Sequence, residues 1–350
     1  MKKSTLTLIF AGLILSSLFY SCKSPNNELI VLYGEELSVV KQLAQESNRA
    51  FALVLSRPDC PPCRDFLQRL GENHERFRGA IFNMIDVSLP ENAWHQQWLY
   101  SGSSPTTCIF SPSGELKAII TGTVETAMQC ISSSIGGNTR CADFFFSRQI
   151  PIADGDRLPM LNAMFWGKHN LETGKDISNA IGEWLPTAQY PFPFYLKFRN
   201  EKQHGRHEEA LYWANRLVSI VGSNQHFTRV YGDVLAQAQY FINPNHAVDG
   251  AVLSVVEELA LGEFRFRESK PFSLTVTNTG RSPLSILHTE IGCSCLAMLS
   301  DRQQTIEPGE SRVMDFRFTA DVRGEILRDI VFVSNGINPV EIVAITATVR

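Results

Sequence analysis

The sequence predicts a multidomain chain in which an α/β domain is followed by helices and then by an all-β domain. Its 350 residues exceed the size of one ordinary domain. Strand and helix patterns alternate over residues 28–138, helical spacing dominates 139–250, and short alternating strands fill 251–350. Hydrophobic residues make up 44% of the chain and charged residues 19%, which is typical of folded globular proteins.

The first 21 residues have the pattern of a targeting segment. Lys2 and Lys3 precede the apolar run 6–19. This run of about 14 residues is shorter than the roughly 20 that span a bilayer. We therefore interpret residues 1–21 as a signal peptide.

Ser21-Cys22 and a short polar stretch come directly after the apolar run. A small residue before a Cys at this place resembles the cleavage site of bacterial lipoproteins. The resemblance implies a lipid on Cys22, a tether over 22–27, and a chain anchored in the bacterial cell envelope, facing either the periplasm or the exterior. An ordinary signal peptide or an uncleaved anchor is the alternative.

Residues 28–138 show the order βαβαββα. The continuous apolar run 51–55 is typical of a strand buried on both faces. Apolar strand runs that alternate with stretches of helical spacing in this order predict a mixed sheet covered by helices. The predicted strands are 29–32, 51–55, 81–87, 107–110 and 116–120, the last two joined by a turn at 111–114.

Cys60-Pro61-Pro62-Cys63 follows the buried run 51–55 and opens a stretch of helical spacing. Two sulfurs at i and i+3 can form a disulfide, and the N-terminus of a helix favours a thiolate on the first Cys. Proline suits the first helical turn because it lacks an N–H. We expect Cys60 to attack a client and Cys63, on the buried helix face, to resolve the mixed disulfide. A static disulfide and a metal site are the alternatives.

Ser104-Pro105-Thr106 stands just before the predicted strand 107–110. Together with the Cys pair and Gly122, it makes residues 28–138 resemble the thioredoxin family. The resemblance implies that the bond before Pro105 is cis and that Pro105 packs beside the redox pair.

Two positions depart from that family. Thioredoxins have an aromatic residue before the first Cys and a carboxylate in the preceding strand, but Asp59 and Val54 stand here. The helix dipole, Arg57 and Arg64 favour the Cys60 thiolate, whereas Asp59 opposes it. We expect a weakly activated, reducing pair.

The chain has eight Cys, and seven remain when Cys22 is set aside. Export would place them in an oxidising space, where disulfides persist. Cys130 and Cys141 flank a Ser- and Gly-rich loop that would let them pair. Cys108 lies in a predicted buried strand, where it acts as a small hydrophobic residue.

Residues 139–250 are interpreted as a helical connector. The segment 195–220 resembles one helix-turn-helix unit of the tetratricopeptide kind, with Gly205 near its turn. One unit is not an array, since repeat arrays need about three. His204 and His207 lack further ligands at metal spacing and are interpreted as surface residues.

Residues 251–350 alternate apolar and polar side chains between polar turns, which predicts a β-sandwich. The stretches 277–280 and 307–310, together with Cys293-Ser294-Cys295, resemble an immunoglobulin-like domain of unknown function found in bacterial envelope lipoproteins. That family has a Cys-Gly-Cys run, whereas Gly292 precedes both Cys here. The resemblance implies a fold and no chemistry.

Three interpretations of Cys293 and Cys295 stay open. They are two small semi-buried residues in a strained loop, a redox relay with the first pair, or a soft-metal site with Met298. We do not prefer the metal site to the other two interpretations, so no metal is assigned to Cys293 and Cys295.

The patterns favour an exported, lipid-anchored thiol–disulfide oxidoreductase that uses Cys60, Cys63 and Pro105 on protein clients, as a reductant and without a cofactor. The alternative is a non-catalytic envelope lipoprotein that binds a partner and keeps the first domain as a scaffold. The net charge is −4 and basic residues are not clustered, so nucleic acid is not expected as a partner.

Overall fold

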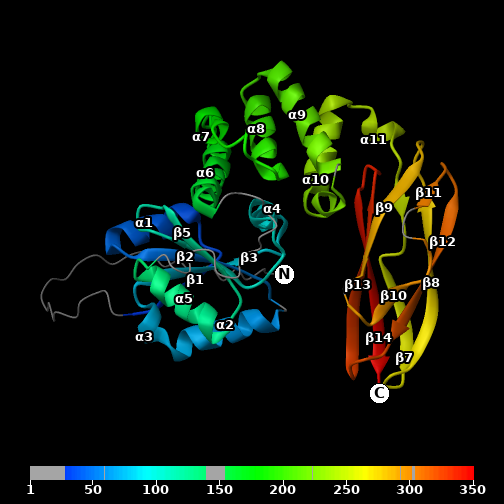
Figure 1. Cartoon of the computed structure of the whole chain (residues 1–350), viewed down its shortest axis with the longest axis horizontal. Helices are drawn as coiled ribbons and strands as arrows, with labels where there is room; N and C mark the ends of the chain where they lie inside the picture. The colour runs from blue at the N-terminus through cyan, green and yellow to red at the C-terminus, as the bar shows by residue number, and fades with distance from the viewer. Residues whose placement is uncertain (1–27, 59, 139–153, 223, 292, 302–303) are drawn as a thin grey trace, which may run out of the picture.

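The structure, a computed structural model, describes residues 28–58, 60–138, 154–222, 224–291, 293–301 and 304–350. The expected signal peptide, Cys22, Asp59, Cys141 and Gly292 lie outside the described residues. Figure 1 shows an α/β region, a set of helices above it, and an all-β region beside it. The domain boundaries drawn from the sequence stay predictions.

The α/β region contains one five-stranded sheet in the order β1-β3-β2-β4-β5. β1, β3 and β2 are parallel to one another, β4 runs antiparallel to β2, and β5 runs antiparallel to β4, so the predicted mixed sheet is confirmed. The strands are β1 Ile30–Tyr33, β2 Ala50–Ser56, β3 Ala80–Asp86, β4 Thr106–Phe110 and β5 Leu116–Thr121. The helices are α1 Leu37–Ser47, α2 Pro61–Glu72, α3 His74–Phe77, α4 Trp94–Leu99 and α5 Glu125–Ile135.

Both faces of this sheet are buried, which explains the continuous apolar run in β2. Ala52 and Val54 belong to a core that also contains side chains of α2 and α5. Phe51 and Leu53 point the other way, into a second core with α1. Successive residues of a strand alternate between faces, so the buried positions 51–55 of β2 are all apolar.

The helical region is α6 Asp154–Glu172, α7 Ser178–Gly182, α8 Pro191–Gln203, α9 His207–Gly222, α10 Gln225–Ile242 and α11 His246–Asp249. The predicted helix-turn-helix is present as α8 and α9, and Gly205 between them has a φ of 71°. The second core of the sheet continues into α6, α8, α9 and α10. The region that was expected to connect two domains therefore also packs on the sheet. No helix of the described residues is long and apolar enough to cross a membrane.

The all-β region is a sandwich of two sheets, in the orders β10-β12-β8-β6 and β11-β9-β13-β14-β7, around one core. Its strands are β6 Leu253–Ser254, β7 Glu258–Phe264, β8 Ser269–Asn278, β9 Leu284–Ile291, β10 Leu296–Met298, β11 Gln304–Ile306, β12 Ser311–Thr319, β13 Gly324–Ser334 and β14 Val340–Val349. The predicted alternation is confirmed, because Met314, Phe316 and Phe318 all point into the core.

Asn278 anchors the turn after β8. It is fully buried, and its Nδ2 donates to the carbonyl oxygens of Ser282 at 2.8 Å and Ile306 at 2.9 Å. Gly280 follows at a close approach of two chain segments, where a Cβ would lie 2.7 Å from the carbonyl carbon of Ala251. The predicted turn residues are therefore required by hydrogen bonding and by space.

Candidate active site

Cys60 is the N-cap residue of α2, and it is joined to Cys63 by a disulfide with a Cα–Cα separation of 5.2 Å. Its backbone is extended, with φ −89° and ψ 108°. Pro61 and Pro62 then fill the first helical turn, where no N–H is needed. The spacing and the prolines together explain why the pair stands at the beginning of a helix.

The two sulfurs differ in exposure. Cys63 is 3% exposed and lies on the buried face of α2, whereas Cys60 is half-buried beside the exposed Pro61 and Pro62. The backbone N–H of Cys63 donates to Sγ of Cys60 at 3.2 Å. A helix N-terminus stabilises negative charge, so this contact favours a thiolate on the accessible Cys60.

The loop before β4 lies against the disulfide. The Ser104–Pro105 peptide bond is cis, and the carbonyl oxygen of Ser104 is 3.8 Å from Sγ of Cys60. The N–H of Gly122 donates to the carbonyl oxygen of Pro105 at 2.9 Å, and Gly122 has a φ of 100°. The structure thus brings Ser104–Pro105 to the Cys60–Cys63 pair, and it links Pro105 to Gly122.

The face of β2 that α2 covers carries no carboxylate. Val54 is fully buried, and among the described residues the buried carboxylate is Glu201, which lies in α8. Thr107 stands opposite Val54 on β4 and is 1% exposed. The hydroxyls of Thr107 and Ser104 are both buried without a hydrogen-bond partner.

Sequence reasoning missed these two hydroxyls. The one available signal is that two Thr open a strand that is otherwise apolar, at 106 and 107. Thr106 is explained by its own contacts, because Oγ1 donates to the carbonyl oxygen of Ser103 at 2.9 Å and lies 3.1 Å from Oγ1 of Thr121. Thr107 has no such explanation.

The other described cysteines do not take part in the Cys60–Cys63 disulfide. Cys293 and Cys295 form a disulfide in the β-sandwich, with Cys295 buried and Cys293 half-buried. Cys108 is a buried free thiol in β4, and burial raises its pKa. Cys130 is buried in α5, while its expected partner Cys141 lies outside the described residues.

The described residues contain no group of three His, Cys, Asp or Glu side chains suited to a metal ion. His204 instead has Nδ1 2.9 Å from the carbonyl oxygen of Asn200, and the His207 ring lies 5.2 Å from the ring of Phe241. Both His therefore have contacts within the helical region.

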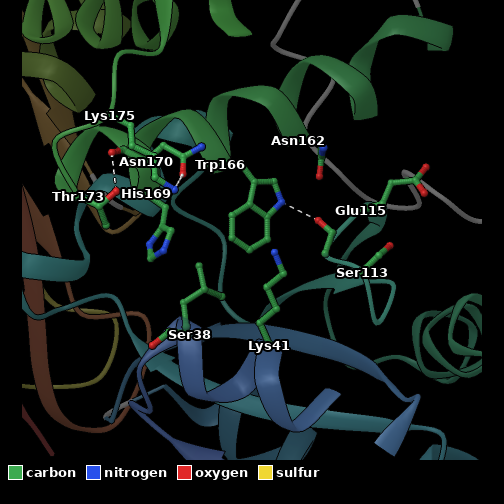
Figure 2. Close-up of a pocket in the computed structure, with 12 residues that line it drawn as sticks. Ser38, Lys41, Ser113, Glu115, Asn162, Trp166, His169, Asn170, Thr173 and Lys175 are labelled. Atoms are coloured by element: carbon green, nitrogen blue, oxygen red, sulfur yellow. Dashed lines mark hydrogen bonds between the residues drawn. The ribbon is translucent and has the colours of Figure 1, made fainter. Parts of the chain in front are cut away.

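A hollow of about 490 Å³ lies between α1, the β4–β5 turn and α6. Figure 2 shows Trp166 of α6 in its wall, with Nε1 donating to the carbonyl oxygen of Gly114 at 2.6 Å. Lys41 of α1 extends to within 4.3 Å of the centre of a Trp166 ring. Neither Cys60 nor Cys63 lines this hollow, so it is separate from the disulfide.

Comparison with known proteins identifies the C-terminal region. The sequence model of the HYDIN/CFA65/VesB-like, Ig-like domain matches residues 251–348. The β-sandwich is therefore an Ig-like domain. No curated protein matches the chain.

Several solved structures resemble parts of the chain. A protein of unknown function from Porphyromonas gingivalis W83 is 21% identical over 29% of this chain and 48% of its own, with a TM-score of 0.26. The secreted serine protease VesC from Vibrio cholerae is 15% identical over 30% of this chain and 24% of its own, with a TM-score of 0.26. A thioredoxin h from poplar is 17% identical over 31% of this chain and 97% of its own, with a TM-score of 0.27. The chain thus spans less than half the length of the first two proteins.

Proposed function

We propose that this chain is a thiol–disulfide oxidoreductase with a thioredoxin-like N-terminal domain. The observation that carries the proposal is the Cys60–Cys63 disulfide at the N-terminus of α2, with one sulfur accessible and the other buried. The contact of Ser104 with Cys60 and the strand order of the sheet support the same proposal. The proposed catalytic residues are Cys60 and Cys63, with Pro105 positioned beside them.

In the reducing direction, the reaction begins with the Cys60 thiolate. It attacks a client disulfide, so that a Cys60–client bond forms and one client sulfur leaves as a thiolate. The Cys63 thiolate then attacks Sγ of Cys60, which releases the second client sulfur and restores the Cys60–Cys63 disulfide. Two electrons pass to the client, and an external dithiol must reduce the pair before the next turnover.

We further propose that the protein works in the envelope of a bacterium, anchored through a lipid on Cys22. The pattern of residues 1–22 supports this location. Its clients are proteins that carry disulfides or thiols. In this proposal the short tether 22–27 joins the anchor directly to the redox domain, and the helices and the Ig-like domain follow it in the chain.

Trapping of the mixed disulfide tests the proposal. Reduced full-length Cys63→Ser should accumulate a disulfide with insulin at Cys60, because the resolving thiol is missing, and peptide mass spectrometry locates it. The matched Cys60→Ser variant should form no such adduct at Cys63, which is buried. Equal adducts in both variants, or none in either, would leave the non-catalytic scaffold as the better account.

A further inference from the structure

We propose that Thr107 supplies the buried hydrogen-bond donor that stabilises the thiolate of Cys63 during the resolving step. This inference rests on the proposed function, and it adds a positioning residue to it. It is carried by the register of β4, the face of α2 that Cys63 occupies, and the missing partner of the Thr107 hydroxyl.

The register places Thr107 on the sheet face that α2 covers. Val54 of β2 and Ile120 of β5 are its direct neighbours in the ladder. Both neighbours belong to the core that contains Phe66 of α2. Paired residues of adjacent strands point to the same face, so the Thr107 hydroxyl faces the same layer.

Cys63 lies on the side of α2 that turns toward this layer. Cys63, Phe66 and Leu70 form the buried stripe of the helix, and the last two pack in the same core as Val54. The contact between Ser104 and Cys60 holds the disulfide over the beginning of β4. Thr107 is the second residue of that strand and comes three residues after Ser104 in the chain.

The state of the Thr107 hydroxyl depends on the redox state of the pair. The hydroxyl is buried and without a partner while Cys60 and Cys63 are joined, and a disulfide sulfur is a poor acceptor. Buried polar groups normally have partners. Reduction produces a thiol at Cys63, and once this thiol has lost its proton the anionic sulfur is a strong acceptor for a neighbouring hydroxyl.

A hydroxyl and a carboxylate would serve this step differently. A buried carboxylate accepts the proton of the resolving thiol, whereas a Thr hydroxyl stays neutral and donates. The hydrogen bond therefore lowers the pKa of the Cys63 thiol, while water takes its proton. The thiolate then attacks Sγ of Cys60, the bond from Cys60 to the client breaks, and the client leaves as a thiolate.

The test compares Thr107→Val with Thr107→Ser in the full chain, with insulin as the client. Val keeps the shape of Thr and removes the donor. We expect the midpoint of the pH profile for mixed-disulfide resolution to rise by about one unit, which slows resolution at pH 7 about tenfold. Formation of the mixed disulfide by Cys60 should be unchanged. Thr107→Ser should restore the wild-type profile to within about twofold, because it keeps the hydroxyl.

Thr289→Val is the matched control. Thr289 lies in β9 of the Ig-like domain, is 4% exposed, and also has a buried hydroxyl without a partner. Its replacement should leave the pH profile unchanged. An unaltered profile in Thr107→Val, with active wild type, would overturn the role of Thr107 alone. A wild type that forms no mixed disulfide would instead overturn the proposed function.

Discussion

His95 illustrates how burial sets the chemistry of a single residue. It lies in α4 and is 5% exposed, with its ring stacked on Trp94 at 3.9 Å between centroids. Its Nδ1 is 2.9 Å from the carbonyl oxygen of Asn92, which fits a neutral ring that donates from Nδ1. Burial, with a smaller contribution from Lys168, lowers the pKa of His95 to about 4, and the hydrogen bond to Asn92 opposes this shift.

This pKa predicts a pH dependence of stability. An unfolded chain binds a proton at His95 below about pH 6.5, and the folded chain does so only near pH 4. Above pH 6.5 the neutral His95 does not lower the free energy of unfolding. As the pH falls from 6.5 toward 4, the unfolded chain takes up a proton at His95 before the folded chain does, so the free energy of unfolding decreases by about 3 kcal/mol in total. His95→Asn keeps a donor for Asn92 and does not titrate. Urea unfolding at pH 4 to 7 should show a shallower pH dependence in this variant, and parallel curves would contradict the assignment.

Still at the scale of single residues, the sequence predicted where the two sulfurs lie but did not predict which side chains surround them. The spacing of Cys60 and Cys63 is local information, and the structure has them at the beginning of a helix as predicted. Thr107 could not be found in this way. Its position opposite Val54 depends on the pairing of strands that are separated by more than 40 residues.

At the scale of elements, α6 covers the face of the sheet opposite the one that α2 covers. Phe165 in α6 is 1% exposed, and its ring centroid lies 4.9 Å from that of Phe110 in β4 and 4.9 Å from that of Trp98 in α4. The indole N–H of Trp98 also donates to the carbonyl oxygen of Leu161 at 2.9 Å. The sheet and the helical region are therefore expected to unfold together.

Phe165→Ala tests this coupling. Removing a buried aromatic ring should cost about 3 to 5 kcal/mol of unfolding free energy. Amide hydrogen exchange should then accelerate in β4 as well as in α6 and α8, because they share one core. Phe316→Ala in the Ig-like domain is the matched control, since Phe316 is fully buried in a separate core. Acceleration confined to α6 in the Phe165 variant would contradict the shared core.

Element types were predictable because their patterns are local, as in the strand alternation of residues 272–276 and the helical spacing of 210–218. The packing of the helical region on the sheet was not. An apolar helix face shows that a partner exists, but the identity of that partner lies elsewhere in the chain. The interpretation of 139–250 as a connector therefore did not include the packing of its helices on the sheet.

At the scale of the whole molecule, the helices join the α/β region to the Ig-like domain. Figure 1 shows α10 beside the β-sandwich and α6 to α8 above the sheet. Gly232 of α10 makes the close approach, because a Cβ there would lie 3.1 Å from the side chains of Pro339 and Val340. Arg229 of α10 forms an ion pair with Glu290 of β9. This arrangement leaves the Cys60–Cys63 pair outside both contacts.

The central claim is that the Cys60–Cys63 pair exchanges disulfides with other proteins. Turnover measures it most directly, through the reduction of insulin by dithiothreitol in the presence of the full-length chain. The wild type should accelerate insulin reduction above the rate with dithiothreitol alone, and Cys60→Ser should return it to that rate, because the attacking sulfur is gone. A Cys60→Ser variant as active as the wild type would contradict the claim.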